Sequence, residues 1–213
     1  MRYPLLGCMA DPAYEAISKA KRQADSGNPE GAEKTLEAYL ATDPHNTRPR
    51  MALAQLYANE LNSREYALMQ LDIVLDIEPD NADALKAMVM MLRVDKKHRK
   101  EAMATYHRLL TSFPDDVDLL NSYAIFLRLQ MTDFKGAAEI YEKALSVDPK
   151  RPEIHYNYAL LLIKDLKDYE KAKEHLESVV RIDPNNANAE EVLERLIAKR
   201  FNGKEKKGLF RRK

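Results

Sequence analysis

Between residues 117 and 149, apolar side chains follow the helical period in two separate stretches. In the first, "VDLLNSYAIFLRLQ", Leu120, Tyr123, Ala124 and Leu127 recur at the i, i+3, i+4, i+7 spacing that defines one face of a helix. The segment "MTDF" then interrupts the pattern, and Asp133 is the expected N-cap of the next helix. The pattern therefore predicts one helix, a short turn and the start of a second helix.

The second stretch, "KGAAEIYEKALSV", repeats the spacing on a second helix. Its apolar face consists of Ala137, Ile140, Tyr141, Ala144 and Leu145. The helix is expected to end at Asp148, because the residue before a proline is pushed out of the α region and Pro149 follows. Residues 117–149 thus form a predicted pair of antiparallel helices.

The same pattern recurs along the chain at an interval of 35 residues. Three kinds of position keep one phase through five copies: a closing proline, an alanine twelve residues before it, and a bulky residue four after the alanine. The prolines are Pro44, Pro79, Pro114, Pro149 and Pro184; the alanines are Ala32, Ala67, Ala102, Ala137 and Ala172; the bulky residues are Leu36, Leu71, Tyr106, Tyr141 and Leu176. A fixed period of this length predicts a repeat architecture, in which stacked units share a continuous core.

The alanines have a mechanical explanation. Two helices joined by a short turn approach closely only where small side chains face each other, so we expect Ala54, Ala124 and Ala159 on the first helices to meet Ala67, Ala137 and Ala172 on the second helices. Val89 breaks this pattern in the third copy. These columns resemble the tetratricopeptide repeat, whose unit has a small residue in helix A, alanine opening helix B, an aromatic residue or leucine four later, and a closing proline. The resemblance implies an all-α, right-handed α-solenoid of stacked antiparallel helix pairs.

The resemblance covers residues 12–186 as five repeats, 12–46, 47–81, 82–116, 117–151 and 152–186, after a lead-in of residues 1–11. Residues 187–200 have Val192, Leu193, Leu196 and Ile197 on one face, which predicts a C-terminal capping helix before a basic, disordered tail at 201–213. The family period is usually 34, so each unit has one extra residue, which we place in the turn between helices A and B. The first copy fits a 34-residue spacing in its helix A, with Ala20 as its small residue.

In the family, the first helices of the pairs line a concave groove that takes a peptide or a partner helix. The resemblance implies groove positions Arg48, Met51, Gln55, Lys86, Met90, Asn121, Ile125, Tyr156 and Leu160. The column Gln55, Met90, Ile125 and Leu160 is mostly apolar, and methionine adapts to irregular partners. Helix A is apolar almost all round, however, so part of this column could be core. Arg93 and Arg128, one turn further on, would then be the exposed groove residues.

Two specialised functions of related repeats do not fit the residues. A clamp for the carboxyl-terminal tails of heat-shock chaperones matches only at Lys86, because Met90, Ser122, Glu153 and Asn157 replace the residues that such a clamp needs. The pentatricopeptide repeats that read RNA also have a period of 35, but they need a basic surface to meet phosphates. Residues 1–198 hold 26 basic and 33 acidic residues, a net charge of −7.

Catalytic chemistry has no support in the sequence. His45, His98, His107, His155 and His175 lie apart, without the spacing of a metal site, and we expect no metal, no cofactor and no catalytic residues. Six glycines without a Gly-rich loop argue against a phosphate-binding loop. The single cysteine, Cys8, excludes an internal disulfide.

The tail is the second functional candidate. Residues 199–213 hold eight basic residues and one acidic residue, a net charge of +7. Contact with an anionic membrane surface or nucleic acid would use Lys204, Lys206, Lys207, Arg211, Arg212 and Lys213. The other interpretation is a disordered, solubilising tail.

The N-terminal "LLGC" resembles a lipoprotein acylation site at Cys8, although too few apolar residues precede it for a secretory signal. We therefore expect a cytoplasmic protein, with membrane association through lipidated Cys8 or the basic tail as the alternative. No run of eighteen apolar residues predicts a transmembrane helix.

These observations predict a non-catalytic adaptor or scaffold that binds a peptide or partner helix of another protein in its groove. A membrane-surface or nucleic-acid-associated assembly factor, tethered by the tail, is the alternative. An exposed apolar face on the first or last helix pair could also form a homodimer. Binding by the tail should weaken steeply with salt, whereas apolar binding in the groove should not.

Overall fold

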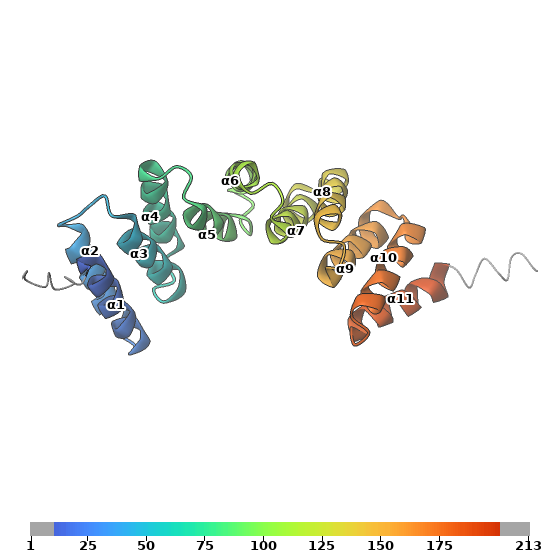
Figure 1. Ribbon diagram of the computed structural model, residues 1–213, viewed down its shortest axis with the longest axis horizontal. Helices are drawn as coiled ribbons and strands as arrows, with labels where there is room; N and C mark the ends of the chain where they lie inside the picture. Colours follow the sequence, from blue (N-terminus) through green and yellow to red (C-terminus); the bar gives the residue numbers. More distant parts are fainter. Residues whose placement is uncertain (1–10, 201–213) are drawn as a thin grey trace, which may run out of the picture. The chain divides into compact units, whose positions relative to one another are not determined.

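The computed structural model describes residues 11–200, and the regular secondary structure in this range is helical (Figure 1). The chain divides into two compact units, Met1–Leu109 and Leu110–Lys213. These residues confirm the predicted all-α fold of stacked helix pairs.

The N-terminal unit is built from helices that alternate between the two roles of the repeat. It contains α1 (Pro12–Asp25), α2 (Pro29–Leu40), α3 (Thr47–Asn59), α4 (Arg64–Ile77) and α5 (Ala82–Leu92), while α6 (Arg99–Ser112) crosses the division between the units. Helix α1 packs against α2, and α3 packs against α4. Further contacts join α2 to α3, α4 to α5 and α1 to α3, so neighbouring pairs share one core.

The C-terminal unit follows the same order and ends with an additional helix. It contains α7 (Val117–Phe126), the π-helical turn η1 (Leu127–Met131), α8 (Phe134–Val147), α9 (Pro152–Leu161), the π-helical turn η2 (Leu162–Leu166), α10 (Tyr169–Ile182) and α11 (Ala187–Arg200). Helix α7 packs against α8, α9 packs against α10, α8 also contacts α9, and α11 packs against α10.

The repeated columns form the core of both units. The five opening alanines of the second helices are all 0% exposed, and the bulky residues that follow them are at most 1% exposed. Leucine and tyrosine are buried equally well at the bulky position. Among the small residues of the first helices, Ala20 is 3% exposed, Ala54 2%, and Ala124 and Ala159 0%. Val89 is also buried, so the third copy accepts a larger side chain at this position. Residues at these equivalent positions of the repeat are therefore buried in every copy.

The turns confirm the expected cap and correct the expected location of the extra residue. The carboxylate of Asp133 accepts a hydrogen bond from the Gly136 amide at 2.9 Å, as an N-cap does. In the first pair the Asn28 amide bonds the Gln23 carbonyl, five residues back, whereas the Asp133 and Asp168 amides bond the carbonyls of Leu127 and Leu162, six residues back. In the last two copies the extra residue therefore widens the last turn of the first helix.

This widening explains the π-helical turns. A π-helical turn is an α-helical turn with one inserted residue. The turns η1 and η2 begin at Leu127 and Leu162, the residues whose carbonyls accept the six-residue hydrogen bonds. The residue that then reverses the chain has a positive φ in four copies: Gly27, Asn62, Thr132 and Lys167, each in the same phase of the period. The prediction that the insertion lies in the turn between the helices was therefore wrong for the last two copies, in which the end of the first helix absorbs it. In the second and third copies, residues 47–116, no π-helical turn occurs, and residues 60–63 and 93–98 separate the two helices.

Candidate partner-binding grooves

The first candidate site is a groove in the N-terminal unit between α3 and α5, which we call the N-terminal groove. It has a volume of about 730 Å³ and is lined mainly by small or flexible side chains, with Leu71 of α4 in its wall. The apolar lining residues are Met51, Ala52, Ala54, Ala58, Ala87, Met90 and Met91. Arg48 and Asp83 give it one charge of each sign, so the groove is close to electrically neutral.

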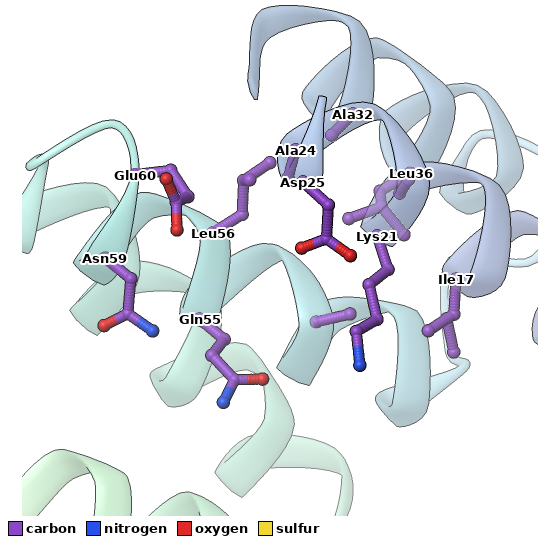
Figure 2. A pocket seen from close by; sticks show the side chains of 12 residues that line it. Ile17, Lys21, Ala24, Asp25, Ala32, Leu36, Gln55, Leu56, Asn59 and Glu60 are labelled. Atoms are coloured by element: carbon purple, nitrogen blue, oxygen red, sulfur yellow. The ribbon is translucent and has the colours of Figure 1, made fainter. Parts of the chain in front are cut away.

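A smaller pocket lies between α1, α2 and α3 (Figure 2). Its volume is about 300 Å³, and Ala32 and Leu36 of α2 contribute to its lining. Figure 2 shows Lys21 and Asp25 of α1 together with Gln55 of α3 around the opening. This pocket also mixes charges of both signs, because Glu60 and Asp25 accompany Lys21.

The structure brings four of the six predicted groove residues of the N-terminal unit together in the N-terminal groove: Arg48, Met51, Gln55 and Met90. Met90 is 55% exposed and Gln55 is exposed, so both are accessible in the groove. Arg48 forms an ion pair with Asp11 at 2.7 Å, and this hydrogen bond lowers the pKa of the Asp11 carboxyl. Lys86 is exposed and Arg93 is partly buried, and neither lines this groove.

In the C-terminal unit the predicted groove residues separate into two groups. Tyr156 and Leu160, both partly buried, line a second groove described below, and Ile125 is partly buried. Asn121 accepts a hydrogen bond from the Asn157 amide at 3.2 Å, which joins α7 to α9.

Arg128 was expected to be an exposed groove residue, but its side chain is mostly buried and is bound within the C-terminal unit. Its Nε bonds the Asp165 carboxylate at 2.6 Å, and the two side chains are only 13% and 22% exposed. Its Nη2 donates to the Leu160 carbonyl at 3.3 Å. Both bonds bind the guanidinium to neighbouring residues of the C-terminal unit. Arg128 at the end of the α7 segment is thereby connected to the end of α9 and to η2.

The second groove lies between α9, η2 and α11, and we call it the C-terminal groove. Its volume is about 510 Å³, and its apolar lining comes from Leu160, Ile163, Val192 and Leu196, with Tyr156 and Tyr169 beside them. The remaining lining residues are all cationic: Lys164, Lys167, Arg195, Lys199 and Arg200. Among residues 11–200, none that lines this groove has a carboxylate.

The cations of the C-terminal groove differ in how far they are already paired. Arg195 forms an ion pair with Glu191 one turn earlier on α11. Arg200 donates to the Tyr169 hydroxyl at 2.9 Å, and its guanidinium lies 4.2 Å from the centre of that ring. Lys167 donates to the Lys164 carbonyl. Among residues 11–200, no carboxylate forms an ion pair with Lys164, Lys167, Lys199 or Arg200.

Sequence reasoning missed the cationic part of this groove. Lys164 and Lys167 lie at the widened end of α9, and Lys199 lies on the capping helix, which has no counterpart in the other copies. A column taken through the five repeats therefore does not reach α11. The signal that could have identified it is local: "IKDLKDY" and "ERLIAKR" each place cations beside apolar residues.

Two histidines from different helices of one pair lie together outside the grooves. The Nδ1 atoms of His155 on α9 and His175 on α10 are 2.8 Å apart, and the Nε2 of His155 lies 3.0 Å from the Pro149 carbonyl. If His155 donates through Nε2 to that carbonyl, its Nδ1 accepts a hydrogen bond from the Nδ1 of His175. In this arrangement His175 is the donor and His155 is the acceptor of the bond between the rings.

The surroundings of His175 favour its neutral form. Burial and, to a smaller extent, electrostatic interactions with His155 and Lys171 lower the pKa of His175 to about 4, and Glu142 opposes them. The ring also packs against Tyr158, with centroids 4.6 Å apart. No group of three or more potential metal ligands occurs in the part of the chain that the structure describes, so this pair has no third ligand there.

The histidine pair predicts a loss of stability in mild acid. The pKa of His175 is lower in the folded chain than in the unfolded one, so as pH falls from about 6.5 towards 4 the unfolded chain gains a proton that the folded chain resists. After allowance for its partial exposure, we expect unfolding at pH 5 to cost about 1 kcal/mol less than at pH 7 through this residue. Thermal melts of the wild type and His175→Phe measure the difference, since the variant should lose this part of the pH dependence. His45→Gln, at an exposed histidine, is the control. An unchanged pH dependence in His175→Phe would contradict the assignment.

Two groups of expectations lie outside the described residues. They are the acylation site at Cys8 and the tail contacts of Lys204, Lys206, Lys207, Arg211, Arg212 and Lys213. Within residues 11–200, none of the helices combines the length and apolar character that a membrane span requires.

Comparison with known proteins supports the repeat family. Residues 128–196, which include α8, α9, α10 and most of α11, match the family model of the tetratricopeptide repeat. The match confirms, for these residues, the resemblance to the tetratricopeptide repeat that the residue columns predicted. The comparison with curated proteins found no match.

Solved structures resemble the fold over most of the chain. MamA (residues 41 to the end) from Desulfovibrio magneticus RS-1 is 20% identical with a TM-score of 0.71, and the match covers 84% of this chain and 99% of that one. A tetratricopeptide repeat protein from Parabacteroides merdae is 20% identical with a TM-score of 0.73, covering 87% and 72%. PilF of Pseudomonas aeruginosa is 23% identical with a TM-score of 0.66, covering 88% and 83%. At these identities the likeness establishes the fold alone.

Proposed function

We propose that this protein is a non-catalytic adaptor or scaffold that binds a peptide or partner helix of another protein between the first helices of its repeats. Repeat proteins of this type present extended binding surfaces made by neighbouring units. The observation that supports the proposal most directly is the N-terminal groove. Two successive first helices, α3 and α5, line it with alanines and methionines, and Met90 is 55% exposed.

The physical basis of binding would be a preformed apolar surface. Alanines let a partner backbone approach closely, and methionine side chains adjust to an irregular partner surface. Because packed helices hold the groove in place, little conformational entropy is lost from this chain when a partner docks. Within this proposal the protein acts in the cytoplasm and needs no cofactor.

The test is affinity purification of the tagged full-length chain from its own cells, washed at low and at high salt and analysed by mass spectrometry. We expect a stoichiometric protein partner that survives high salt and is lost with Met90→Glu, because a carboxylate in the apolar groove loses its hydration when the partner docks. Met69→Glu is the matched control, since Met69 is 45% exposed on α4 and does not line the groove. Equal recovery of the partner with both variants, or no partner at high salt, would overturn the proposal.

A further inference from the structure

We infer that the C-terminal groove is a binding site for an acidic amphipathic peptide segment, in which leucine-like or phenylalanine-like side chains alternate with aspartate or glutamate. The inference deepens the proposed function and rests on it, because it assigns a chemical class of partner to a second groove of the same adaptor. The site combines the apolar lining described above with four cations that form no ion pair within residues 11–200.

The apolar residues determine where the partner's hydrophobic side chains would dock. Leu160 and Ile163 come from the end of α9 and η2, and Val192 and Leu196 come from α11. The groove volume of about 510 Å³ accommodates a few apolar side chains but not a folded domain. A short segment therefore fits this site better than a broad, flat protein surface.

The cations determine the sign of the partner's charge. Lys164 and Lys167 border the groove from η2 and the turn after it, while Lys199 and Arg200 border it from the end of α11. A basic or neutral apolar segment would partly desolvate these four charges without supplying a carboxylate, whereas an acidic segment would form ion pairs with them. Tyr156 and Tyr169 also line the groove, and tyrosine, which has an apolar ring and a polar hydroxyl, is enriched at protein interfaces.

The grooves of the N-terminal unit provide an internal comparison. The N-terminal groove has one cation and one carboxylate, and the pocket of Figure 2 contains Lys21 beside Asp25 and Glu60. Neither surface selects for charge, although both are built from the same repeated helices. The charge of the C-terminal groove is therefore a local feature of η2 and α11 and does not follow from the repeat itself.

This site differs from a clamp for a terminal carboxylate. Its cations come from two separate parts of the chain, η2 with the turn after it and α11, so we expect them to meet several side-chain carboxylates of a segment. Blocking the C-terminus of a peptide as an amide should therefore leave its binding unchanged. An anionic membrane would need protruding apolar residues, whereas here the apolar residues line a concave surface.

The inference is tested with a fluorescent peptide of alternating leucine, phenylalanine and glutamate, blocked at both ends, and the full-length protein. Two matched peptides replace every glutamate by lysine or every apolar residue by serine. We expect fluorescence anisotropy to show binding of the acidic amphipathic peptide only. Lys164→Glu/Lys167→Glu should weaken it roughly tenfold or more, because two attractive charges become repulsive.

Lys135→Glu/Lys150→Glu is the matched control: it makes the same change in net charge at two exposed lysines of the C-terminal unit outside the groove. It should leave binding unchanged, and circular dichroism should show that both variants fold. Equal weakening by the two double variants, or undiminished binding by Lys164→Glu/Lys167→Glu, would overturn the inference, because the tail or the general charge would then hold the peptide.

Vesicles of phosphatidylcholine and phosphatidylserine distinguish a membrane from a peptide. If the groove variant loses vesicle binding while the acidic peptide does not bind the wild type, the inference is wrong. The proposed adaptor function fails separately, through the Met90→Glu experiment, because Met90 lies in the other unit.

Discussion

Replacing Leu176 with alanine is expected to lower the free energy of unfolding of the C-terminal unit by about 3 kcal/mol. Leu176 is 0% exposed on α10, which packs against α9, η2 and α11. Helices on several sides limit how far the site can collapse, so the substitution should leave a cavity as well as remove apolar contacts. Urea denaturation followed by far-UV circular dichroism measures the loss.

Leu129 provides the control for this prediction. It is a leucine of the same unit that is 61% exposed in η1, so Leu129→Ala removes the same atoms without making a buried cavity. Its effect should remain within about 0.5 kcal/mol. Similar losses for the two variants would show that the repeated bulky column does not form the core. In a repeat protein the transition can contain more than one step, so the comparison uses the step that belongs to the C-terminal unit.

The core could be predicted from the sequence because one physical requirement recurs in every copy. Ala137 must be small where two helices approach, and Tyr141 must be large one turn later where the next pair packs. A requirement that repeats every 35 residues leaves a periodic signal, and a single chain is enough to detect it.

The features that the sequence did not predict are those that depend on how the helices end. One inserted residue can be absorbed in a turn or in a helix, and the period is the same in both cases, so η1 and η2 could not be located from spacing. The ion pair between Arg128 and Asp165 also depends on those turns, because Arg128 lies in η1 and Asp165 lies in η2.

The C-terminal groove was missed for a related reason. Its cations come from η2, the following turn and α11, of which α11 stands outside the repeat. Likewise, His155 and His175 are twenty residues apart in sequence, and only the packing of α9 against α10 brings their rings together. A column analysis compares equivalent positions of different copies and therefore does not detect contacts between unlike positions.

The ion pair between Arg128 and Asp165 should contribute more to stability than a surface pair of the same kind. Both side chains are mostly buried, and Arg128 also donates to the Leu160 carbonyl. Arg128→Met leaves the Asp165 carboxylate without its partner in a partly desolvated site, so we expect a loss of about 2 kcal/mol in the free energy of unfolding. Arg128→Lys should not restore it, because an ammonium group cannot reproduce both bonds of the planar guanidinium.

A double-mutant cycle separates the pair from its surroundings. Arg128→Met, Asp165→Asn and the double variant, measured by urea denaturation, should give a coupling of about 1–2 kcal/mol. The matched cycle uses Arg195 and Glu191, an exposed pair on α11 with side chains 61% and 64% exposed, for which we expect about 0.3–0.5 kcal/mol. Equal couplings would mean that solvent screens both pairs alike. A larger coupling for Arg128 and Asp165 would mean that the widened helix ends are joined by a buried polar contact. The π-turns would then contribute to the stability of the stack in addition to accommodating an extra residue.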